Sequence, residues 1–320
     1  MHPITDPQLL EGLAGFEEAV PGGIKLDDIP ATREFLDGLN AAMAATMPPI
    51  EGVRSVDHHA PGLNGAHEVM VRVYRPESAA GTLPALLWIH GGGYVLGNVE
   101  GDEPRVKTMV KSLNCVIASV EYRLAPENPF PAPLEDCYAA LHWLSNEADN
   151  LGIDATRIAI GGASAGGGLA AGLGLMTRDR GEIDICYQLL IYPMIDDTNV
   201  KPAGPGMPDA PLWNRENNLV GWRSYLGQEP GSADVSPYAA AFRAEDLRGL
   251  PPTYIGVGTP DLFRDENIDY AKRLIAAEVP TELHVYTDGF HAFDIFAPEA
   301  DASQRFTSEY LRLLRSALHE

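Results

Sequence analysis

Short apolar segments alternate with helical patterns along most of the chain. Several of these segments, such as residues 85–89, are almost wholly apolar, which is typical of strands buried on both faces of a sheet. The strand-like segments are residues 67–74, 85–89, 115–121, 157–160, 185–191, 253–257 and 281–286. Helical periodicity fills residues 135–147, 164–177, 266–277 and 303–318. This alternation predicts an α/β fold with a mainly parallel, doubly wound sheet.

Two stretches interrupt the alternation, residues 1–50 before the first strand and residues 197–250 between two later ones. Within the second, Leu212, Leu219, Trp222 and Leu226 recur at helical spacing and predict an amphipathic helix. The chain therefore divides into an N-terminal segment (1–50), an insertion (197–250) and a main domain formed by residues 51–196 and 251–320. We expect the segment and the insertion to form a lid together; peripheral packing is the alternative.

Charge and hydropathy narrow the range of partners. The 320 residues include 45 acidic and 23 basic side chains, a net charge of -22, which repels nucleic acid and anionic lipid surfaces. No apolar run approaches the ~18 residues of a membrane helix, and the first residues lack the basic and apolar regions of a secretory signal. We therefore expect a soluble, cytoplasmic protein without a nucleic-acid partner; the sequence leaves a homodimer open.

The cysteines do not predict a metal site. Cys115, Cys137 and Cys186 are too few and too widely spaced for a zinc cluster, and their odd number argues against a disulfide framework. We expect buried, reduced thiols that serve packing, and no metal.

Residues 162–166 read Gly-Ala-Ser-Ala-Gly and lie between a predicted strand and a predicted helix. Glycines in this context let a strand turn sharply into a helix, which projects the serine hydroxyl above the carboxyl edge of the sheet. Ser164 is therefore the candidate nucleophile.

The same glycines allow another interpretation. Gly162, Gly166 and Gly168 match the spacing of the cofactor loop of a short-chain dehydrogenase. That loop should follow the first strand, and a Tyr-x-x-x-Lys should follow it downstream, whereas here the loop follows several strands and no Tyr-x-x-x-Lys occurs. The sequence therefore disfavours a dehydrogenase.

A second glycine motif, His-Gly-Gly-Gly at residues 90–93, follows the apolar strand that ends at residue 89. In an acyl-transfer enzyme, backbone N–H groups exposed by such glycines stabilise a developing oxyanion together with the N–H after the nucleophile. The candidates are Gly92, Gly93 and Ala165. A tight turn with no chemical role is the alternative.

An acid and a base should follow the serine in that order, each after a later strand. Asp261 follows the strand at 253–257, and His291 follows the strand at 281–286. Other candidates fit less well, because His284 lies inside a strand and Asp265 is placed to favour a helix N-terminus. Asp288 has the position of a turn residue.

With these motifs in place, the chain closely resembles the hormone-sensitive lipase-like family of bacterial esterases. The resemblance covers most of the chain and rests on residues 90–93, 122–127 (Tyr-Arg-Leu-Ala-Pro-Glu), 130–136 (Phe-Pro-Ala-Pro-Leu-Glu-Asp), 162–167, 261–265 and 289–293 (Gly-Phe-His-Ala-Phe). It implies an α/β-hydrolase domain under a helical cap made of residues 1–50 and 197–250. It also implies a serine carboxylesterase that hydrolyses short to medium acyl esters without a cofactor.

One position departs from the family, whose members commonly carry Asp or Thr where this chain has Ala163. This difference bears on the subfamily to which the chain is assigned. The assignment of Ser164 as nucleophile is unaffected, because the triad does not use the side chain at position 163. A lactonase or peptidase on the same scaffold and a non-enzymatic ligand receptor are the alternative functions, although a receptor has no need of serine, acid, base and oxyanion glycines together. Within the insertion, we expect Trp213, Leu219 and Trp222 to line the substrate pocket.

Overall fold

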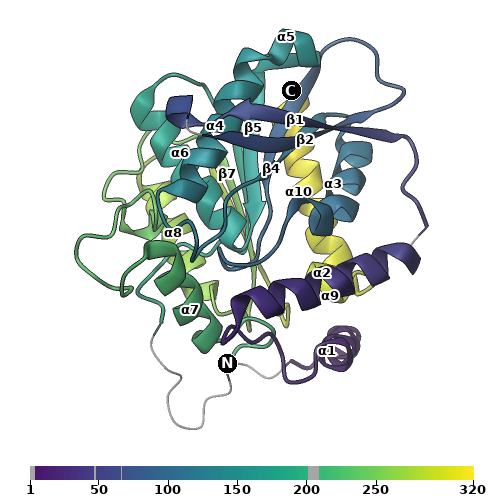
Figure 1. Ribbon diagram of the computed structural model, residues 1–320, viewed down its shortest axis with the longest axis vertical. Helices are drawn as coiled ribbons and strands as arrows, with labels where there is room; N and C mark the ends of the chain where they lie inside the picture. Colours follow the sequence, from purple (N-terminus) through teal and green to yellow (C-terminus); the bar gives the residue numbers. More distant parts are fainter. Residues whose placement is uncertain (1–3, 47, 66, 201–208) are drawn as a thin grey trace.

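An eight-stranded, mostly parallel sheet forms the centre of the computed structural model, which describes residues 4–46, 48–65, 67–200 and 209–320 (Figure 1). The spatial order is β1-β2-β4-β3-β5-β6-β7-β8; β1/β2 and β2/β4 pair antiparallel and the other neighbours pair parallel. The strands are β1 (Val53–Pro61), β2 (Glu68–Pro76), β3 (Leu83–Ile89), β4 (Val116–Glu121), β5 (Ile153–Ala163), β6 (Tyr187–Ile191), β7 (Thr253–Gly258) and β8 (Thr281–Tyr286). The predicted α/β fold class is confirmed.

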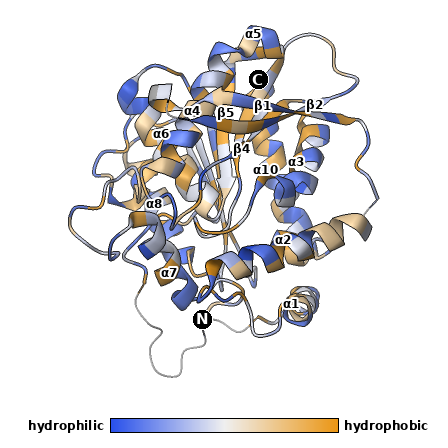
Figure 2. Ribbon diagram, in the orientation of Figure 1, coloured by the Kyte–Doolittle hydropathy of each residue, from blue (hydrophilic) through white to orange (hydrophobic). Residues whose placement is uncertain are grey.

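Helices cover both faces of the sheet, as a parallel sheet requires. Helices α3 and α10 supply one hydrophobic core, and α4, α6 and α8 supply the other. The helices are α1 (Pro7–Ala19), α2 (Ile29–Thr46), α3 (Val99–Leu113), α4 (Ala132–Asn146), α5 (Ala148–Leu151), α6 (Ala165–Arg180), α7 (Arg215–Leu226), α8 (Arg264–Ala276), α9 (Phe293–Phe296) and α10 (Asp301–His319), with 3-10 turns η1 (Leu63–Gly65) and η2 (Ala241–Arg243). Figure 2 shows hydrophobic residues along the central strands and mixed polarity on the outer helices.

Strand β1 and helix α3 are among the elements that the hydrophobic pattern missed. Strand β1 is an antiparallel edge strand whose middle residues are largely exposed, so it lacks the apolar run of a buried strand. Helix α3 buries an apolar face but carries Pro104 inside it and is polar on its other face. Its start is marked by Asn98, whose side chain accepts a hydrogen bond from the backbone N–H of Gly101 at 2.8 Å.

The N-terminal helices and the helix of the insertion lie at one end of the molecule (Figure 1). The predicted insertion helix is α7, which begins at Arg215, so Leu212 precedes the helix and has a left-handed backbone (φ 70°) instead of a helical one. Residues 201–208 of the insertion lie outside the described residues. The carboxylate of Asp197, fully buried at the start of the insertion, is paired with Arg243 near its end (2.5 Å), which fastens the two ends together.

Among the residues that the structure describes, no helix is both long enough and apolar enough to cross a membrane.

Candidate active site

Ser164 lies at the turn between β5 and α6, in the strained conformation that the glycine motif predicts. Its backbone is left-handed (φ 58°, ψ -122°). The turn is so tight that a Cβ on Gly162 would lie 2.3 Å from the carbonyl oxygen of Gly166, and one on Gly166 would lie 2.1 Å from that of Ile89. Any larger residue at either position would clash with the neighbouring backbone, so both positions require glycine. The turn holds Ser164 at the carboxyl edge of the sheet.

The structure brings the three residues of the predicted triad together. His291 Nε2 lies 2.9 Å from Ser164 Oγ, and His291 Nδ1 lies 2.8 Å from Asp261 Oδ2. All three residues are buried, with 8% of Ser164 and 4% of each of the others exposed. The other carboxylate oxygen of Asp261 accepts a hydrogen bond from the backbone N–H of Phe263 at 2.9 Å, so both oxygens are engaged. This arrangement can relay a proton from the serine to the imidazole.

Two aromatic rings contact the imidazole of His291 in edge-to-face geometry. The ring centroid of Tyr192 lies 4.8 Å from that of His291, and the centroid of Phe263 lies 5.1 Å from it. The Tyr192 hydroxyl donates to Asp294 (2.8 Å) and accepts from Arg105 (3.1 Å), and burial raises the pKa of this tyrosine well above its ordinary value, so the hydroxyl stays a donor. No local sequence motif marks these two contacts of the histidine, so they were not predicted.

The second glycine motif lies directly beside the serine. A Cβ on Gly91 would lie 2.9 Å from the carbonyl oxygen of Ala163, and Gly92 (φ 122°) and Gly93 (φ 60°) have backbones that favour glycine. Among the described residues, the backbone N–H groups of Gly92, Gly93 and Ala165 donate to no protein acceptor. These groups are therefore available to a ligand oxygen next to Ser164.

A cavity of about 820 Å³ opens beside Ser164 and His291. Its floor includes residues 90–93 and Tyr192, and its walls come from α1, α2, α3, α9 and residues before α7. Residues of the two N-terminal helices that line it include Gly12, Phe16, Leu36, Asn40 and Met43. The N-terminal segment thus lines the same cavity as the serine.

The three insertion residues predicted for the pocket have different positions. Trp213 lines the cavity; a Cβ on Gly93 would lie 2.0 Å from its ring. Leu219 and Trp222 do not line it, which corrects this part of the prediction. Trp222 is fully buried and packs against Tyr94, with ring centroids 5.2 Å apart, because α7 turns this face toward the protein interior. Helical spacing alone does not distinguish an interior face from a pocket wall.

The competing acids and histidine have other partners. Asp265 is exposed and forms an ion pair with Arg264 (2.6 Å). His284 lies 3.3 Å from Glu282 on the surface of β8, outside the cavity. Asp288 binds the start of the chain through hydrogen bonds with Thr5. Asp261 and His291 are therefore the acid and the histidine placed beside Ser164.

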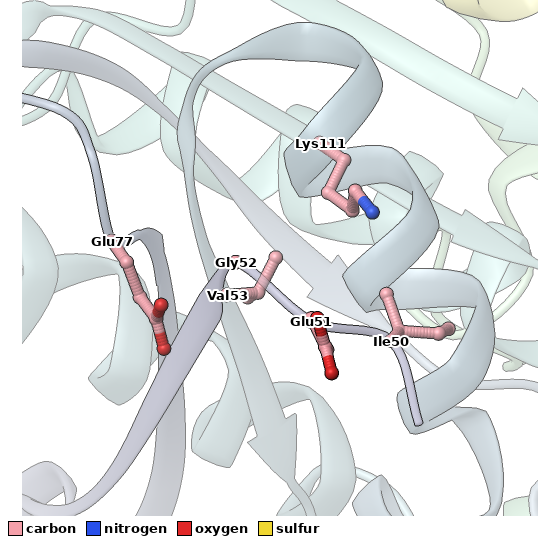
Figure 3. Close-up of a pocket in the computed structure, with 6 residues that line it drawn as sticks. All are labelled: Ile50, Glu51, Gly52, Val53, Glu77 and Lys111. Carbon is pink, nitrogen blue, oxygen red and sulfur yellow. The ribbon is translucent and has the colours of Figure 1, made fainter. Parts of the chain in front are cut away.

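Two other features lie outside the cavity beside Ser164. A second hollow of about 750 Å³ is lined by residues 50–53, Glu77 and Lys111 (Figure 3), and it contains none of the predicted site residues. Among the described residues, Glu282, His284 and Glu309 bring ligand atoms within 4.8 Å of one another. Glu309 is already paired with Arg312 at 2.7 Å, and the group shares no residue with the cavity beside Ser164.

Comparisons with known proteins agree with this geometry. Residues 86–295 match the alpha/beta hydrolase fold family. Carboxylesterase NlhH of Mycobacterium tuberculosis is 34% identical over 302 residues (92% of this chain, 94% of the relative), and esterase LipI of the same species is 34% identical over 320 residues (99% and 96%). The solved structure of a bacterial heroin esterase superposes with a TM-score of 0.93 at 42% identity, covering 99% of both chains. The chain therefore belongs to the α/β-hydrolase family and, as its motifs predicted, to the hormone-sensitive lipase-like esterases.

Proposed function

We propose that this carboxylic ester hydrolase cleaves esters of short to medium acyl chains, with Ser164 as nucleophile, His291 as general base and Asp261 as the acid that orients the histidine. The observation that carries the proposal is the continuous hydrogen-bonded chain from Asp261 through His291 to Ser164, on the floor of a large cavity. Relatives named as esterases over nearly the full chain support it.

In the first half of the reaction, Ser164 Oγ attacks the ester carbonyl while His291 Nε2 takes its proton. The carbonyl oxygen becomes an oxyanion, which accepts hydrogen bonds from the backbone N–H groups of Gly92, Gly93 or Ala165. Asp261 holds the proton on Nδ1, so that Nε2 is free to accept, and stabilises the imidazolium that forms. The imidazolium then protonates the leaving alkoxide, and the alcohol departs from an acyl-enzyme.

In the second half, water enters the position that the alcohol has left. His291 takes a proton from the water, whose oxygen attacks the acyl carbon, and the same N–H groups stabilise the second oxyanion. Collapse of this intermediate returns the proton from His291 to Ser164 and releases the carboxylic acid. The side chain at position 163 takes no part in these steps, so Ala163 is compatible with them.

The cap of the enzyme is proposed to consist of α1, α2 and the insertion at residues 197–250. Support comes from the cavity, whose walls include both N-terminal helices and Trp213. A hydrophobic wall discriminates by only ~1–3 kcal/mol per methylene, so the cap should adjust preference among esters without determining the chemistry. A cytoplasmic location stays a prediction from the sequence, and a homodimer stays open.

The test is hydrolysis of p-nitrophenyl esters by the parent and by Ser164→Ala, with Ser232→Ala as a matched control outside the elbow. We expect Ser164→Ala to lose on the order of 10³-fold or more in kcat while keeping its melting temperature, and Ser232→Ala to retain activity. A fluorophosphonate should label the parent and the control but not Ser164→Ala. Undiminished hydrolysis by Ser164→Ala would refute the mechanism, and preferential cleavage of lactones or peptides in a parallel panel would reassign the substrate class.

A further inference from the structure

A single carboxylate joins the first residues of the described chain to the loop that carries His291. Asp288 Oδ2 accepts hydrogen bonds from the backbone N–H of Thr5 (2.8 Å), the hydroxyl of Thr5 (2.7 Å) and the backbone N–H of Asp6 (3.0 Å). Asp288 is 7% exposed, so these bonds are shielded from water. Asp6 also caps α1 by accepting from the N–H of Gln8 (2.9 Å). The carboxylate therefore holds the very start of α1.

The same residue contacts the loop that carries Asp261. The backbone N–H of Asp288 donates to Thr259 Oγ1 at 2.9 Å, and Thr259 lies two residues before Asp261. Asp288 has a left-handed backbone (φ 64°), and Gly258 approaches Gly289 so closely that a Cβ on Gly258 would lie 1.5 Å from its carbonyl oxygen. Asp288 is thus located where α1, the acid loop and the histidine loop meet.

Helix α1 is also held by the side chain of Gln8, which accepts a hydrogen bond from the backbone N–H of Asp301 at 3.0 Å. Only Leu9 and Phe16 of this helix are buried, and it packs on α9, where Phe16 and Phe296 meet edge to face at 4.9 Å. Gly12 and Phe16 also line the cavity beside Ser164. Any shift of α1 therefore moves a wall of the cavity, whereas the serine, histidine and acid lie on other elements.

From this arrangement we infer that Asp288 is a positioning residue. It holds α1 against the histidine loop and so fixes the position of the cavity wall that longer acyl chains contact. The inference rests on the proposed function for its kinetic consequence. The carboxylate serves the cap, and the backbone N–H serves the acid loop, so the two roles can be separated by mutation. Loss of the carboxylate should weaken binding of long esters, and loss of the Thr259 hydroxyl should slow the chemistry for every ester.

The experiment compares the parent with Asp288→Asn, Thr5→Val and Thr259→Val on p-nitrophenyl acetate and octanoate. Asparagine keeps a side chain that tolerates the left-handed backbone at this position. Asp288→Asn should raise KM for octanoate about 10-fold, which corresponds to about 1.4 kcal/mol, and KM for acetate less than about 3-fold. Thr5→Val removes one of the described bonds, the one from the Thr5 hydroxyl, and should give a smaller shift in the same direction. Thr259→Val should lower kcat for both esters.

Hydrogen exchange of α1 provides a readout that does not depend on catalysis. Exchange of peptides covering residues 7–19 should quicken about 10-fold in Asp288→Asn. Asp28→Asn is the matched control, because Asp28 is exposed and its carboxylate accepts a hydrogen bond from the backbone N–H of Ala31 (3.1 Å), within the N-terminal segment. It should leave both KM values and α1 exchange unchanged.

Unchanged α1 exchange and an unchanged octanoate KM in Asp288→Asn would refute the proposal that Asp288 positions α1. An equal loss of kcat on both esters, with α1 exchange unaltered, would also overturn it, because Asp288 would then act on the catalytic loops. If the parent hydrolyses no ester at all, the proposed function fails, and the exchange measurement alone decides whether Asp288 holds α1.

Discussion

Replacing Asp261 by asparagine removes one acceptor from a position where two are in use. Asp261 Oδ2 faces His291 Nδ1 at 2.8 Å, and Oδ1 accepts the backbone N–H of Phe263 at 2.9 Å. Asparagine has one oxygen and one NH₂ group, so the two donors compete for a single acceptor. If the oxygen stays with Phe263, the NH₂ group faces His291 and favours the tautomer with its proton on Nε2. That tautomer cannot accept the proton of Ser164.

The catalytic orientation of the asparagine has a cost that can be estimated. With the oxygen turned to His291, the buried N–H of Phe263 loses its acceptor, which costs about 1–3 kcal/mol. Exchanging a charged acceptor for a neutral one weakens the hydrogen bond to the imidazolium by about 1–2 kcal/mol more. The sum of about 2–5 kcal/mol predicts that kcat falls between about 30-fold and several thousand-fold, at 1.36 kcal/mol per tenfold change.

The assay is steady-state hydrolysis of p-nitrophenyl butyrate, with Asp265→Asn as the matched control four residues away. Asp265 is exposed and forms only a surface ion pair with Arg264, an interaction worth at most about 1 kcal/mol, so the control should lose less than about 5-fold. Melting temperatures establish that both variants fold. Retention of parental kcat by Asp261→Asn, or a larger loss in Asp265→Asn, would refute the assignment of the acid.

Two further outcomes follow from the environments of single side chains. Trp213 lines the cavity and the buried Trp222 does not, so Trp213→Ala should shift the preferred acyl-chain length among acetate to decanoate esters, whereas Trp222→Phe should change only the melting temperature. The same chain-length profile in both variants would contradict this. Burial raises the pKa of Glu266 well above its ordinary 4.5, so its contribution to stability is complete below pH 4.5 and is lost as the pH rises through the folded-state pKa. In urea unfolding, the stability of the parent relative to Glu266→Gln should therefore fall as the pH rises above 4.5, and a difference that does not change with pH would contradict this.

The candidate triad could be predicted from the sequence because the position of each of its residues is fixed by nearby backbone structure. Ser164 needs glycines on both sides to make its turn, and such spacing is visible in the sequence. Asp261 follows β7, an apolar strand whose residues are all buried, and His291 follows β8, an edge strand that is only partly buried. Parallel strands place their carboxyl ends at one edge of the sheet, so the order along the chain was enough to predict that the three residues meet.

The remaining features depend on contacts between distant segments. Asp288 was interpreted as a turn residue, and its left-handed backbone agrees with a turn, but its bonds to Thr5 span 283 positions and no local pattern encodes them. Trp222 was predicted to line the pocket because it shares a helical face with Leu219. Which way that face turns depends on the packing of α7 against Tyr94, a contact between residues more than 100 positions apart.

Two constraints require glycine at position 93, the positive φ of its backbone and the close approach of the Trp213 ring. A double mutant can separate their effects on stability. Alanine at Gly93 would have to adopt φ 60°, at a cost of about 1–2 kcal/mol, and its Cβ would also lie 2.0 Å from the buried ring of Trp213, where overpacking adds about 1–3 kcal/mol. In a Trp213→Ala background the second cost disappears. Gly93→Ala should therefore lower the free energy of unfolding by about 2–5 kcal/mol in the parent but by only about 1–2 kcal/mol beside Trp213→Ala, a coupling of at least about 1 kcal/mol in urea denaturation. Equal effects in both backgrounds would mean that the ring moves aside freely and that Gly93 is required for its backbone alone.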